Sequence, residues 1–463
     1  MPAGHFRVPV RIAAAMPSSV TDLATTRPEL EALVARILEE AKTRGATQAE
    51  AGVSIDAGLS VNVRLGEVET LEYQRDRALG VTVYFGQRKA SASSADLSAR
   101  AVAETVEKAC SIARFTAEDP CAGLAEAELL ERNPPDLDLS HPWELSAEQA
   151  IDLARECEDA ARAEDPRITN SEGASLSTHR GLRAYGNSHG FLGSYPSSRH
   201  GLSCAVLSEQ DGAMERDYWY TTSRDPVELE GAANVGRRAA LRTVARLGAR
   251  KLGTCRAPVL FPAELARGFF GHFLGAIRGS AQYREASFLL NAAGQRVFAE
   301  HVEIVQRPHI PKALASAPFD NEGVVTRDRD LVQRGVLQGY VMGSYSARKL
   351  GLQTTGNAGG VWNLLVTPGS DDFDALLRRM GRGLLLGELM GPGVNNVTGD
   401  YSRGAAGYWV EDGEIQHPVN EITIAGNLKD LYQHIVAIGT DTDLRGAVRT
   451  GSILVEEMTI AGE

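Results

Sequence analysis

The spacing of hydrophobic residues predicts a helix followed by strands at the start of the chain. Over 28–44, apolar residues recur every three or four positions, with Pro28 suited to the first turn and Gly45 to the end of an amphipathic helix. Apolar and polar residues then alternate, as in half-buried strands, over 51–55, 60–65 and 80–85. A second helical pattern at 99–113 completes this segment.

The same order of elements recurs further along the chain. Helical patterns at 146–163 and 226–247 enclose two pairs of predicted strands. The pairs are expected at 172–178 with 181–187, and at 201–207 with 214–221. Short turns such as Asp211-Gly212 favour antiparallel pairing. The repetition suggests a duplication of topology without a repeat of sequence.

The second half of the chain is richer in strands and contains one very apolar helix. Residues 264–277 combine helical spacing with phenylalanine and leucine on most faces, so this helix is expected to be buried. A further helix is predicted at 371–386. Strands are expected over 405–425, where Asp412-Gly413 suits the turn of a hairpin, and Asn427 can cap the helix that follows.

These patterns predict an α+β protein of two domains, because 463 residues exceed what one hydrophobic core usually holds. We expect a flexible N-terminal extension over 1–27, and an N-terminal domain of helices and antiparallel sheet over 28–250. The remaining residues, 251–463, are expected to form a β-rich C-terminal domain with the apolar helix buried inside it.

Composition and charge argue against several classes of function. The formal net charge of −12 disfavours electrostatically driven binding to nucleic acid. No apolar run approaches the length that crosses a membrane. The five cysteines are odd in number, widely spread and without a Cys-x-x-Cys pair, which is typical of a protein in a reducing cytoplasm. We therefore expect a cytoplasmic protein whose partners are neither nucleic acid nor membrane.

Four stretches carry a family resemblance. They are GFFGHFLGAIRG at 268–279, ASAPFDNEGVVT at 315–326, SYSARKLGLQTTGNAGG at 344–360 and TGDYSRGAAGYWVEDGEIQHPVNEITIAGNLKD at 398–430. Together they resemble the TldD/PmbA family, and most of all its PmbA branch, which is also called TldE. The resemblance covers most of the chain after about residue 258 and, more weakly, the N-terminal half. It implies a zinc peptidase activity at the level of the family.

The resemblance also implies that this chain departs from the family's zinc motif. In the TldD branch, the helix equivalent to 264–277 carries two histidines and a glutamate, which hold the metal and activate water. Here the helix contains only His272, no glutamate follows it, and the last cysteine of the chain is Cys255. Because a catalytic zinc needs about three protein ligands, we expect no cofactor and no catalytic residue in this chain, with the zinc in a partner subunit.

Several residues are candidates for contact with a peptide. The glycine-rich loop 354–360 lets the main chain approach a ligand closely, and a tight structural turn explains it equally well. Arg348 can bind a carboxylate through both arms of its fork, or form a structural ion pair. The polar groups near 400 suit local capping as well as binding. The candidate peptide-binding residues are His272, Tyr345, Arg348, Thr355, Gly356, Asn357, Gly359, Gly360, Asp400, Tyr401 and Arg403.

The function that the resemblance implies is that of a subunit which pairs with a TldD-type zinc peptidase and helps it to act on unfolded peptides and small proteins. The alternative is a non-enzymatic protein that binds peptides or regulates other proteins, and that self-associates as a homodimer. A third interpretation, an independent hydrolase, requires activity without metal or partner that depends on Ser402 or His272. The first two differ in whether activity appears when a metal-bearing partner is added.

Overall fold

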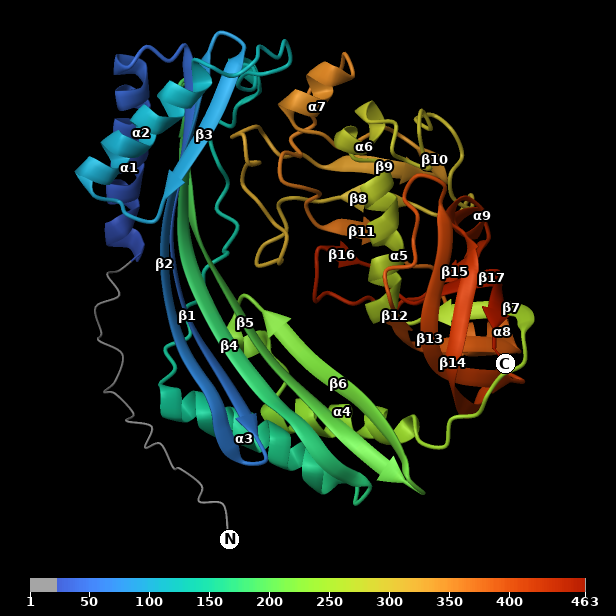
Figure 1. Cartoon of the computed structure of the whole chain (residues 1–463). Coiled ribbons are helices and arrows are strands. Elements are labelled where there is room, and N and C mark those ends of the chain that lie inside the picture. Colours follow the sequence, from blue (N-terminus) through green and yellow to red (C-terminus); the bar gives the residue numbers. More distant parts are fainter. Residues whose placement is uncertain (1–22, 463) are drawn as a thin grey trace.

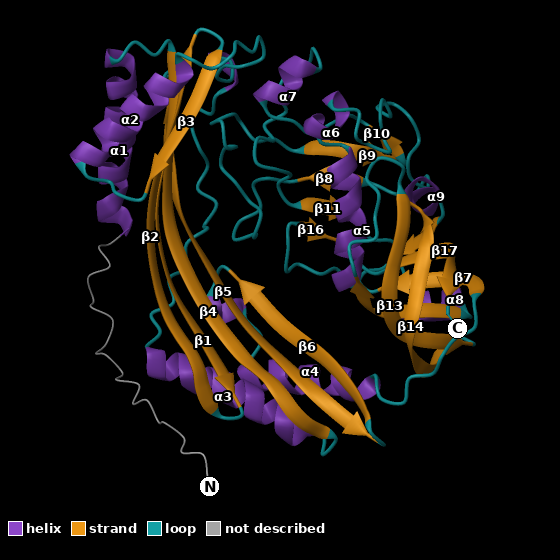
Figure 2. Cartoon of the chain, in the orientation of Figure 1, coloured by secondary structure: helices purple, strands orange, loops and turns teal. Residues whose placement is uncertain are grey.

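The computed structural model describes residues 23–462, which form a long curved sheet followed by a β-rich second half (Figures 1 and 2). The extension expected at 1–27 lies outside the described residues as far as residue 22. From Leu23 the chain is helical, so the first helix begins before its predicted start and Pro28 lies inside it. Within residues 23–462, no helix combines the length and hydrophobicity that crossing a membrane requires.

The first half runs twice through helix, three strands and helix. The first set is α1 (Leu23–Thr43), β1 (Gln48–Arg64), β2 (Glu67–Phe85), β3 (Arg88–Ser94) and α2 (Ala99–Ala113). The second set is α3 (Ala147–Glu164), β4 (Ile168–Asn187), β5 (Leu192–Gln210), β6 (Ala213–Ser223) and α4 (Ala232–Ala245). All six strands pair antiparallel in the order β3-β2-β1-β4-β5-β6, so β1 and β4 join the two meanders. The predicted antiparallel sheet and the duplication of topology are confirmed.

The strands of this sheet are longer than the sequence pattern predicts. The predicted strands 51–55 and 60–65 are both part of β1, and the predicted pair 172–178 with 181–187 is the single strand β4. The prediction separates the two strands between 178 and 181, but a side chain at Gly181 would overlap the Asp56 carboxylate of the neighbouring strand. The glycine therefore permits a close approach inside a continuous strand, which is a second use of glycine in sheets.

One face of the long sheet is apolar, and four helices cover it. At one end, α1 and α2 pack on a core that includes Val53 and Val81. At the other end, α3 and α4 pack on a core that includes Val61, Leu176 and Val206. Figure 2 shows these helices on the outer side of the curved strands. The opposite face of the sheet is turned towards the second half of the chain.

The second half contains two sheets with a helix packed between them. Its elements are β7 (Cys255–Phe261), α5 (Ala263–Ala276), α6 (Gly279–Tyr283), β8 (Ile304–Gln306), β9 (Arg329–Gln333), β10 (Val336–Leu337), α7 (Ser344–Lys349), β11 (Leu364–Val366), α8 (Phe373–Met380), β12 (Gly383–Met390), β13 (Asp400–Glu411), β14 (Glu414–Asn427), α9 (Leu428–Gln433), β15 (Ile435–Ile438), β16 (Val448–Arg449) and β17 (Ile453–Ala461). The larger sheet has the order β14-β13-β12-β7-β17-β15 and closes through a pairing of β14 with β17. The smaller sheet has the order β10-β9-β8-β11-β16.

Helix α5 is the buried apolar helix that the sequence predicts. Phe269, Phe270 and Phe273 are at most 2% exposed and share one core with residues of both sheets. The hairpin of β13 and β14 turns at Asp412 and Gly413, which both have positive φ. The α+β class and the β-rich second half are therefore confirmed.

The predicted helix at 371–386 is wrong in its second part. Helix α8 ends at Met380, because Gly381 adopts a φ of 64° that leaves the helical conformation. The leucines that follow belong to strand β12, in which Leu384 and Leu386 are buried in the large core and Leu385 in a separate cluster. A short apolar run fits a buried strand as well as a helix, so spacing alone does not distinguish them.

Candidate functional site

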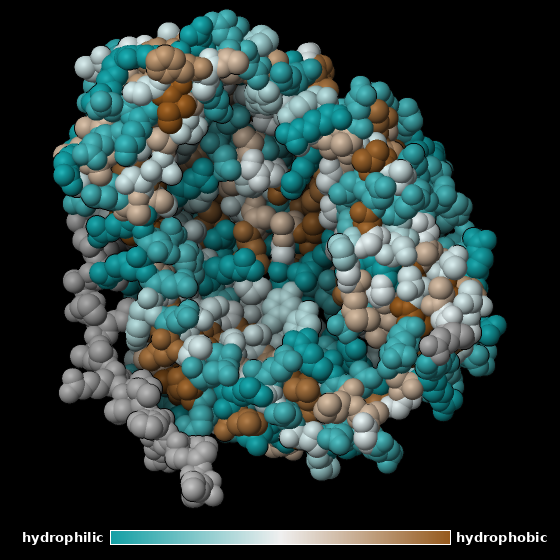
Figure 3. All heavy atoms as spheres, viewed as in Figure 1, coloured by the Kyte–Doolittle hydropathy of each residue, from teal (hydrophilic) through white to brown (hydrophobic). Residues whose placement is uncertain are grey.

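A hollow lies between the inner face of the long sheet and the second half of the chain (Figure 3). On the side of the sheet, a recess of about 530 Å³ is lined by side chains that alternate along β4, β5 and β6. Hydroxyl, imidazole and guanidinium groups dominate this lining: Ser175, Ser177, His179, Arg199, Tyr218, Tyr220 and Thr222. His179 lies 3.2 Å from the Asp56 carboxylate on the neighbouring strand β1. This surface combines hydrogen-bonding groups with the apolar area of Leu202 and the two tyrosine rings.

A second recess, of about 430 Å³, lies between α6, α7 and the glycine-rich loop. It brings together four of the predicted residues, Tyr345, Asn357, Gly359 and Gly360. Helices α6 and α7 lie side by side at one end of the hollow (Figure 1). We call this space the rim recess. It is the place where three separate stretches of the family resemblance meet, namely 268–279, 315–326 and 344–360.

The loop of the rim recess is held by a buried amide. Asn357 is 6% exposed, and its Nδ2 donates to Gln306 Oε1 and to the Gly360 carbonyl oxygen, each at 2.7 Å. Its Oδ1 accepts from Arg329 at 3.1 Å and lies 2.9 Å from the Thr355 hydroxyl. All four hydrogen-bonding positions of the amide are used inside the protein. Asn357 and Thr355 therefore shape the loop, and the main chain is what the loop presents to the recess.

The glycines of this loop have different roles. Gly356 has a φ of 68°, and a side chain there would overlap the Val325 carbonyl oxygen. Gly359 has a φ of 107° and lies against Asn321. Gly360 has open space around the position of a side chain. Gly356 and Gly359 are thus required by the fold, as the structural interpretation of the loop expected.

Arg348 is occupied by contacts within the chain. Its guanidinium donates to the carbonyl oxygens of Cys121 at 3.2 Å and Gly123 at 3.0 Å, and also to that of Leu124. It further pairs with Glu126 at 3.2 Å. Arg348 therefore joins α7 to a loop of the first half, and the structural interpretation of this residue fits its contacts.

His272 and Tyr401 form a separate group beside the buried core. The two rings meet edge to face with 6.0 Å between their centroids. Burial and the nearby Arg403 lower the pKa of His272, and burial raises the pKa of Tyr401 to about 12. Arg403 itself donates to the carbonyl oxygens of Gly391 at 2.9 Å and Leu389 at 3.3 Å. His272 is therefore neutral at pH 7 and packs on an aromatic ring, in place of the carbonyl contact expected for a core histidine.

Asp400 acts locally at the start of β13. Its carboxylate accepts from the Thr398 hydroxyl at 2.7 Å and from Asn427 Nδ2 at 3.0 Å. These two hydrogen bonds lower the pKa of Asp400. Asn427 in turn caps α9 by accepting from the Lys429 N–H at 3.0 Å. Asp400 thus stabilises a turn and is not among the residues that line the rim recess.

The rim recess contains charged residues that the sequence patterns did not single out. Arg278 and Glu322 line it, together with Tyr283. Behind them, Asp320 is 1% exposed and accepts the N–H groups of Glu322, Val324 and Ala358 at 2.8–2.9 Å. Burial and the charge of Glu322 raise the pKa of Asp320 to about 7. The sequence signal for Arg278, Asp320 and Glu322 is that they fall within two of the stretches that carry the family resemblance, whereas Tyr283 lies outside all four.

The residues present do not form a binding site for a zinc ion. Among residues 23–462, no three histidine, cysteine, aspartate or glutamate side chains are grouped so that they could hold a metal. On α5, the face that bears Gly268, Gly271 and Gly275 has open space where side chains would stand. His272 is the one imidazole of this helix and packs on Tyr401. Since a catalytic zinc takes about three protein ligands, the donor set of α5 does not fit one.

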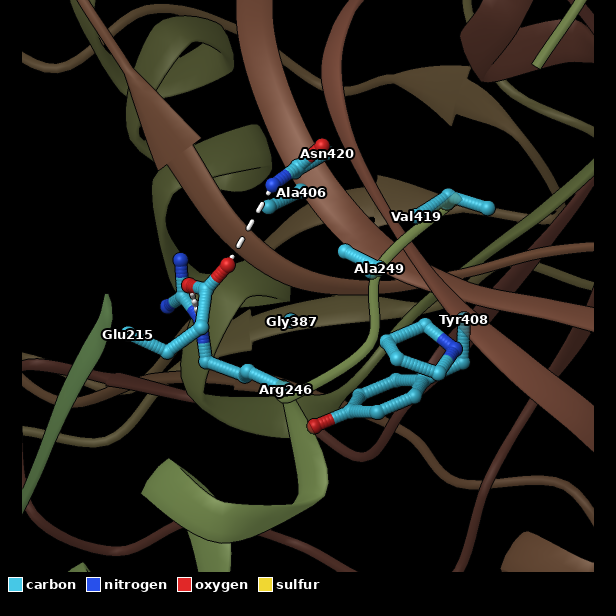
Figure 4. Close-up of a pocket in the computed structure, with 10 residues that line it drawn as sticks. Glu215, Arg246, Ala249, Gly387, Ala406, Tyr408, Val419 and Asn420 are labelled. Carbon is cyan, nitrogen blue, oxygen red and sulfur yellow. Dashed lines mark hydrogen bonds and ion pairs between the residues drawn. The ribbon is translucent and has the colours of Figure 1, made fainter. Parts of the chain in front are cut away.

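A third space, at the seam between the two halves, is too small for a substrate. Figure 4 shows Glu215 of β6 and Arg246 at the end of α4 facing Asn420 and Tyr408 of the large sheet. The void between them measures about 10 Å³, which is room for about one water molecule. Glu215 accepts from Asn420 at 3.2 Å and pairs with Arg246 at 3.2 Å. This space is part of a charged contact that holds the two halves together.

The fold and the site define an α+β protein whose central hollow is reached by polar side chains from both halves. Family models match it over 49–113 (PmbA/TldA metallopeptidase domain 1), 140–247 (central domain) and 254–462 (C-terminal domain). Metalloprotease PmbA of Escherichia coli O157:H7 is 50% identical over 96% of this chain and 98% of its own. The chain belongs to the PmbA/TldD metallopeptidase family and, within it, to the PmbA (TldE) group.

Solved structures and more distant relatives agree with this assignment. A candidate modulator of DNA gyrase from Bacteroides thetaiotaomicron has a TM-score of 0.90 at 26% identity, covering 95% of this chain and 100% of its own. TldE from Thermococcus kodakarensis shares the fold, with a TM-score of 0.82 at 20% identity over 93% of this chain and 100% of its own. A metalloprotease TldD homolog from Haemophilus influenzae is 24% identical over 82% of each chain. Both branches of the family are therefore among its relatives.

Proposed function

We propose that this chain is the subunit without metal of a TldD/TldE-type peptidase, and that a TldD-type partner supplies the zinc ion and the water-activating glutamate. The observation that carries the proposal is helix α5. Where the TldD branch has two histidines and a glutamate, α5 has His272 alone, packed on Tyr401 and beside a face of glycines. A helix with this donor set supports a role in enclosing and contacting substrate.

The proposed substrates are unfolded peptides and small proteins. An extended chain exposes main-chain N–H and C=O groups at regular intervals, and the sheet recess offers hydroxyl and imidazole groups at a similar repeat along its strands. Such a surface binds main chain with little preference for side chains. The five cysteines are all free thiols, which supports a cytoplasmic location for the complex.

The test is hydrolysis of casein by the purified chain, by its TldD-type partner and by their mixture. The proposal predicts no hydrolysis by the chain alone, hydrolysis by the mixture, and loss of that hydrolysis on addition of a chelator. Changing the glutamate of the partner's metal helix to glutamine should abolish hydrolysis by the mixture. Hydrolysis by this chain alone would contradict the proposal. A mixture that neither associates nor hydrolyses casein, together with dimers of the chain itself, would favour the non-enzymatic homodimer.

A further inference from the structure

Two side chains of opposite charge, Arg278 and Glu322, line the rim recess and do not form an ion pair with each other. Its volume of about 430 Å³ falls in the range of small-molecule sites, roughly 300–1,000 Å³. Arg278 and Glu322 both line it. Within residues 23–462, no ion pair links the two side chains. A cation and an anion that line one small space without touching leave both charges available to a ligand between them.

One oxygen of Glu322 is held and the other is open. Oε2 accepts from the Ser344 N–H at 2.9 Å and from the Ser344 hydroxyl at 2.6 Å, which fixes the carboxylate. Oε1 lies 3.1 Å from the point where a side chain on Gly343 would begin. Within the described residues, Oε1 accepts no hydrogen bond, and the absence of a side chain on Gly343 leaves space beside it. The carboxylate is thus oriented by the protein, with an accepting atom left for a ligand.

Arg278 is held by its main chain and exposed at its side chain. Its backbone pairs with Val341 in a parallel bridge and caps α6. The side chain is exposed, and no hydrogen bond or ion pair of its guanidinium is found within the described part of the chain. A guanidinium with free donors and a fixed backbone is suited to a carboxylate.

Two tyrosines form the wall near these charges. Tyr283 and Tyr345 meet edge to face with 6.1 Å between their ring centroids. The Tyr345 hydroxyl donates a hydrogen bond to the Asp119 carboxylate at 2.7 Å, which fixes the ring. Arg284 lies over the Tyr283 ring at 5.4 Å and Lys349 over the Tyr345 ring at 5.3 Å, so cations of the protein already occupy faces of both rings. The main chain at Gly359 and Gly360 forms another wall, where a ligand backbone can approach closely.

We propose that the rim recess binds a small zwitterion of the amino-acid and short-peptide class, with its ammonium group at Glu322 and its carboxylate at Arg278. The proposal goes beyond the function given above, because binding needs neither the partner subunit nor hydrolysis. In a peptidase complex, such a ligand is a product of the reaction.

The test is isothermal titration calorimetry on the full chain without partner, with alanine, Ala-Ala and Ala-Ala-Ala as probes. We expect at least one probe to bind, and the length that binds best reports the span between the two charges. Acetylating the amino end or amidating the carboxyl end of that probe should weaken binding about 10- to 100-fold each. The proposal would be overturned if none of the three probes binds, or if neither acetylation nor amidation changes the affinity of the probe that binds.

Variants assign each charge to one end of the ligand. Arg278→Gln should remove the preference for a free carboxylate, and Glu322→Gln the preference for a free ammonium. Arg327→Gln and Glu285→Gln are matched controls, since both residues are exposed and do not line the recess. Equal binding by Arg278→Gln, Glu322→Gln and the controls would contradict the proposal.

Discussion

The guanidinium of Arg348 reaches from α7 to the carbonyl oxygens of Cys121, Gly123 and Leu124. The Arg348 side chain is 24% exposed, so water reaches these carbonyl groups poorly when the guanidinium is removed. The neighbouring Lys349 pairs with Asp119 at 3.3 Å, and both of these side chains are about a third exposed. The two adjacent cations therefore contribute very differently to the contact between the halves.

Arg348→Ala should lower the free energy of unfolding by about 2–4 kcal/mol, because it leaves several carbonyl groups without a donor. Lys349→Ala is the matched control and should lower it by less than about 1 kcal/mol, as is usual for surface ion pairs. Urea denaturation followed by circular dichroism measures both. Equal losses in the two variants would show that Arg348 does not hold the halves together.

The buried carboxyl group of Asp320 predicts a dependence of stability on pH. Its pKa is about 7 in the folded chain against an ordinary value of 3.8, because of burial first and Glu322 second. Between about pH 4 and pH 7 the folded state therefore holds a proton that the unfolded state has lost. The free energy of unfolding should fall as pH rises through this window, by up to about 1.4 kcal/mol per pH unit from this group, and level off above it.

Asp320→Asn should flatten that dependence, as measured by urea denaturation at pH 5, 6, 7 and 8. The variant also loses an acceptor for the Ala358 N–H, so its stability is lower throughout and the slope is the quantity to compare. A variant with the slope of the unchanged chain would assign the pH dependence to other groups.

At the scale of single residues, the sequence indicated the residues of the loop that line the rim recess, but it did not indicate the charged residues Arg278 and Glu322. Tyr345, Gly359 and Gly360 stand in one dense stretch whose glycines suggested close contact with a ligand. Glu322 and Arg278 come from distant parts of the chain, and no spacing rule relates them. The ion pair of Arg348 with Glu126 fits the structural alternative that the sequence left open, whereas its carbonyl partners carry no signal in the sequence.

Helix α5 and the glycine-rich loop use glycine in opposite ways. On α5, Gly271 is exposed and a side chain there would meet nothing within 4 Å. In the loop, Gly356 has a φ of 68° and lies against the Val325 carbonyl oxygen. The first glycine costs helix stability without a packing reason, and the second is required by the backbone.

Gly271→Ala should raise the free energy of unfolding by about 0.5–1 kcal/mol, because alanine loses less conformational entropy in a helix. Gly356→Ala should lower it by about 2 kcal/mol or more through strain and overlap. Thermal denaturation of the two variants beside the unchanged chain gives both signs. A destabilised Gly271→Ala would mean that the open face of α5 is covered in solution.

At the scale of elements, hydrophobic spacing predicted α5, the hairpin of β13 and β14, and the repeated order of the first half. It divided β1 and β4, because polar residues and Gly181 interrupt the pattern where the strands cross the hollow. Side chains that face the hollow need not be apolar. Of the positions that separate the predicted strands, His179 lines the sheet recess.

At the scale of the whole molecule, a cluster of ion pairs at the seam links the first half of the chain to the second. Arg246 is 14% exposed and pairs with Glu388 at 2.7 Å, Glu215 at 3.2 Å and Asp217 at 3.7 Å. Glu388 belongs to the second half and the two other acids to β6. Among the described residues, removing the guanidinium leaves Glu215 and Glu388 without an ion pair, whereas Asp217 keeps Arg242 at 3.5 Å.

Arg246→Ala should lower the free energy of unfolding by about 3–5 kcal/mol, because it leaves the Glu215 and Glu388 carboxylates without their ion pair. It should also separate the melting of the two halves into two transitions in calorimetry. Arg256→Ala is the matched control, since its pair with Glu457 is mostly exposed and contributes less than about 1 kcal/mol. A single sharp transition of unchanged temperature in Arg246→Ala would contradict this role of the seam.

The measurement that tests the central claim most directly is the zinc content of the purified chain and of its complex with a TldD-type partner, by native mass spectrometry. We predict no stoichiometric zinc on the chain alone, because α5 offers one imidazole and the described residues form no donor cluster. In the complex, zinc should appear in proportion to the partner subunit. Stoichiometric zinc on the chain alone would contradict the account and would place a metal site in this subunit.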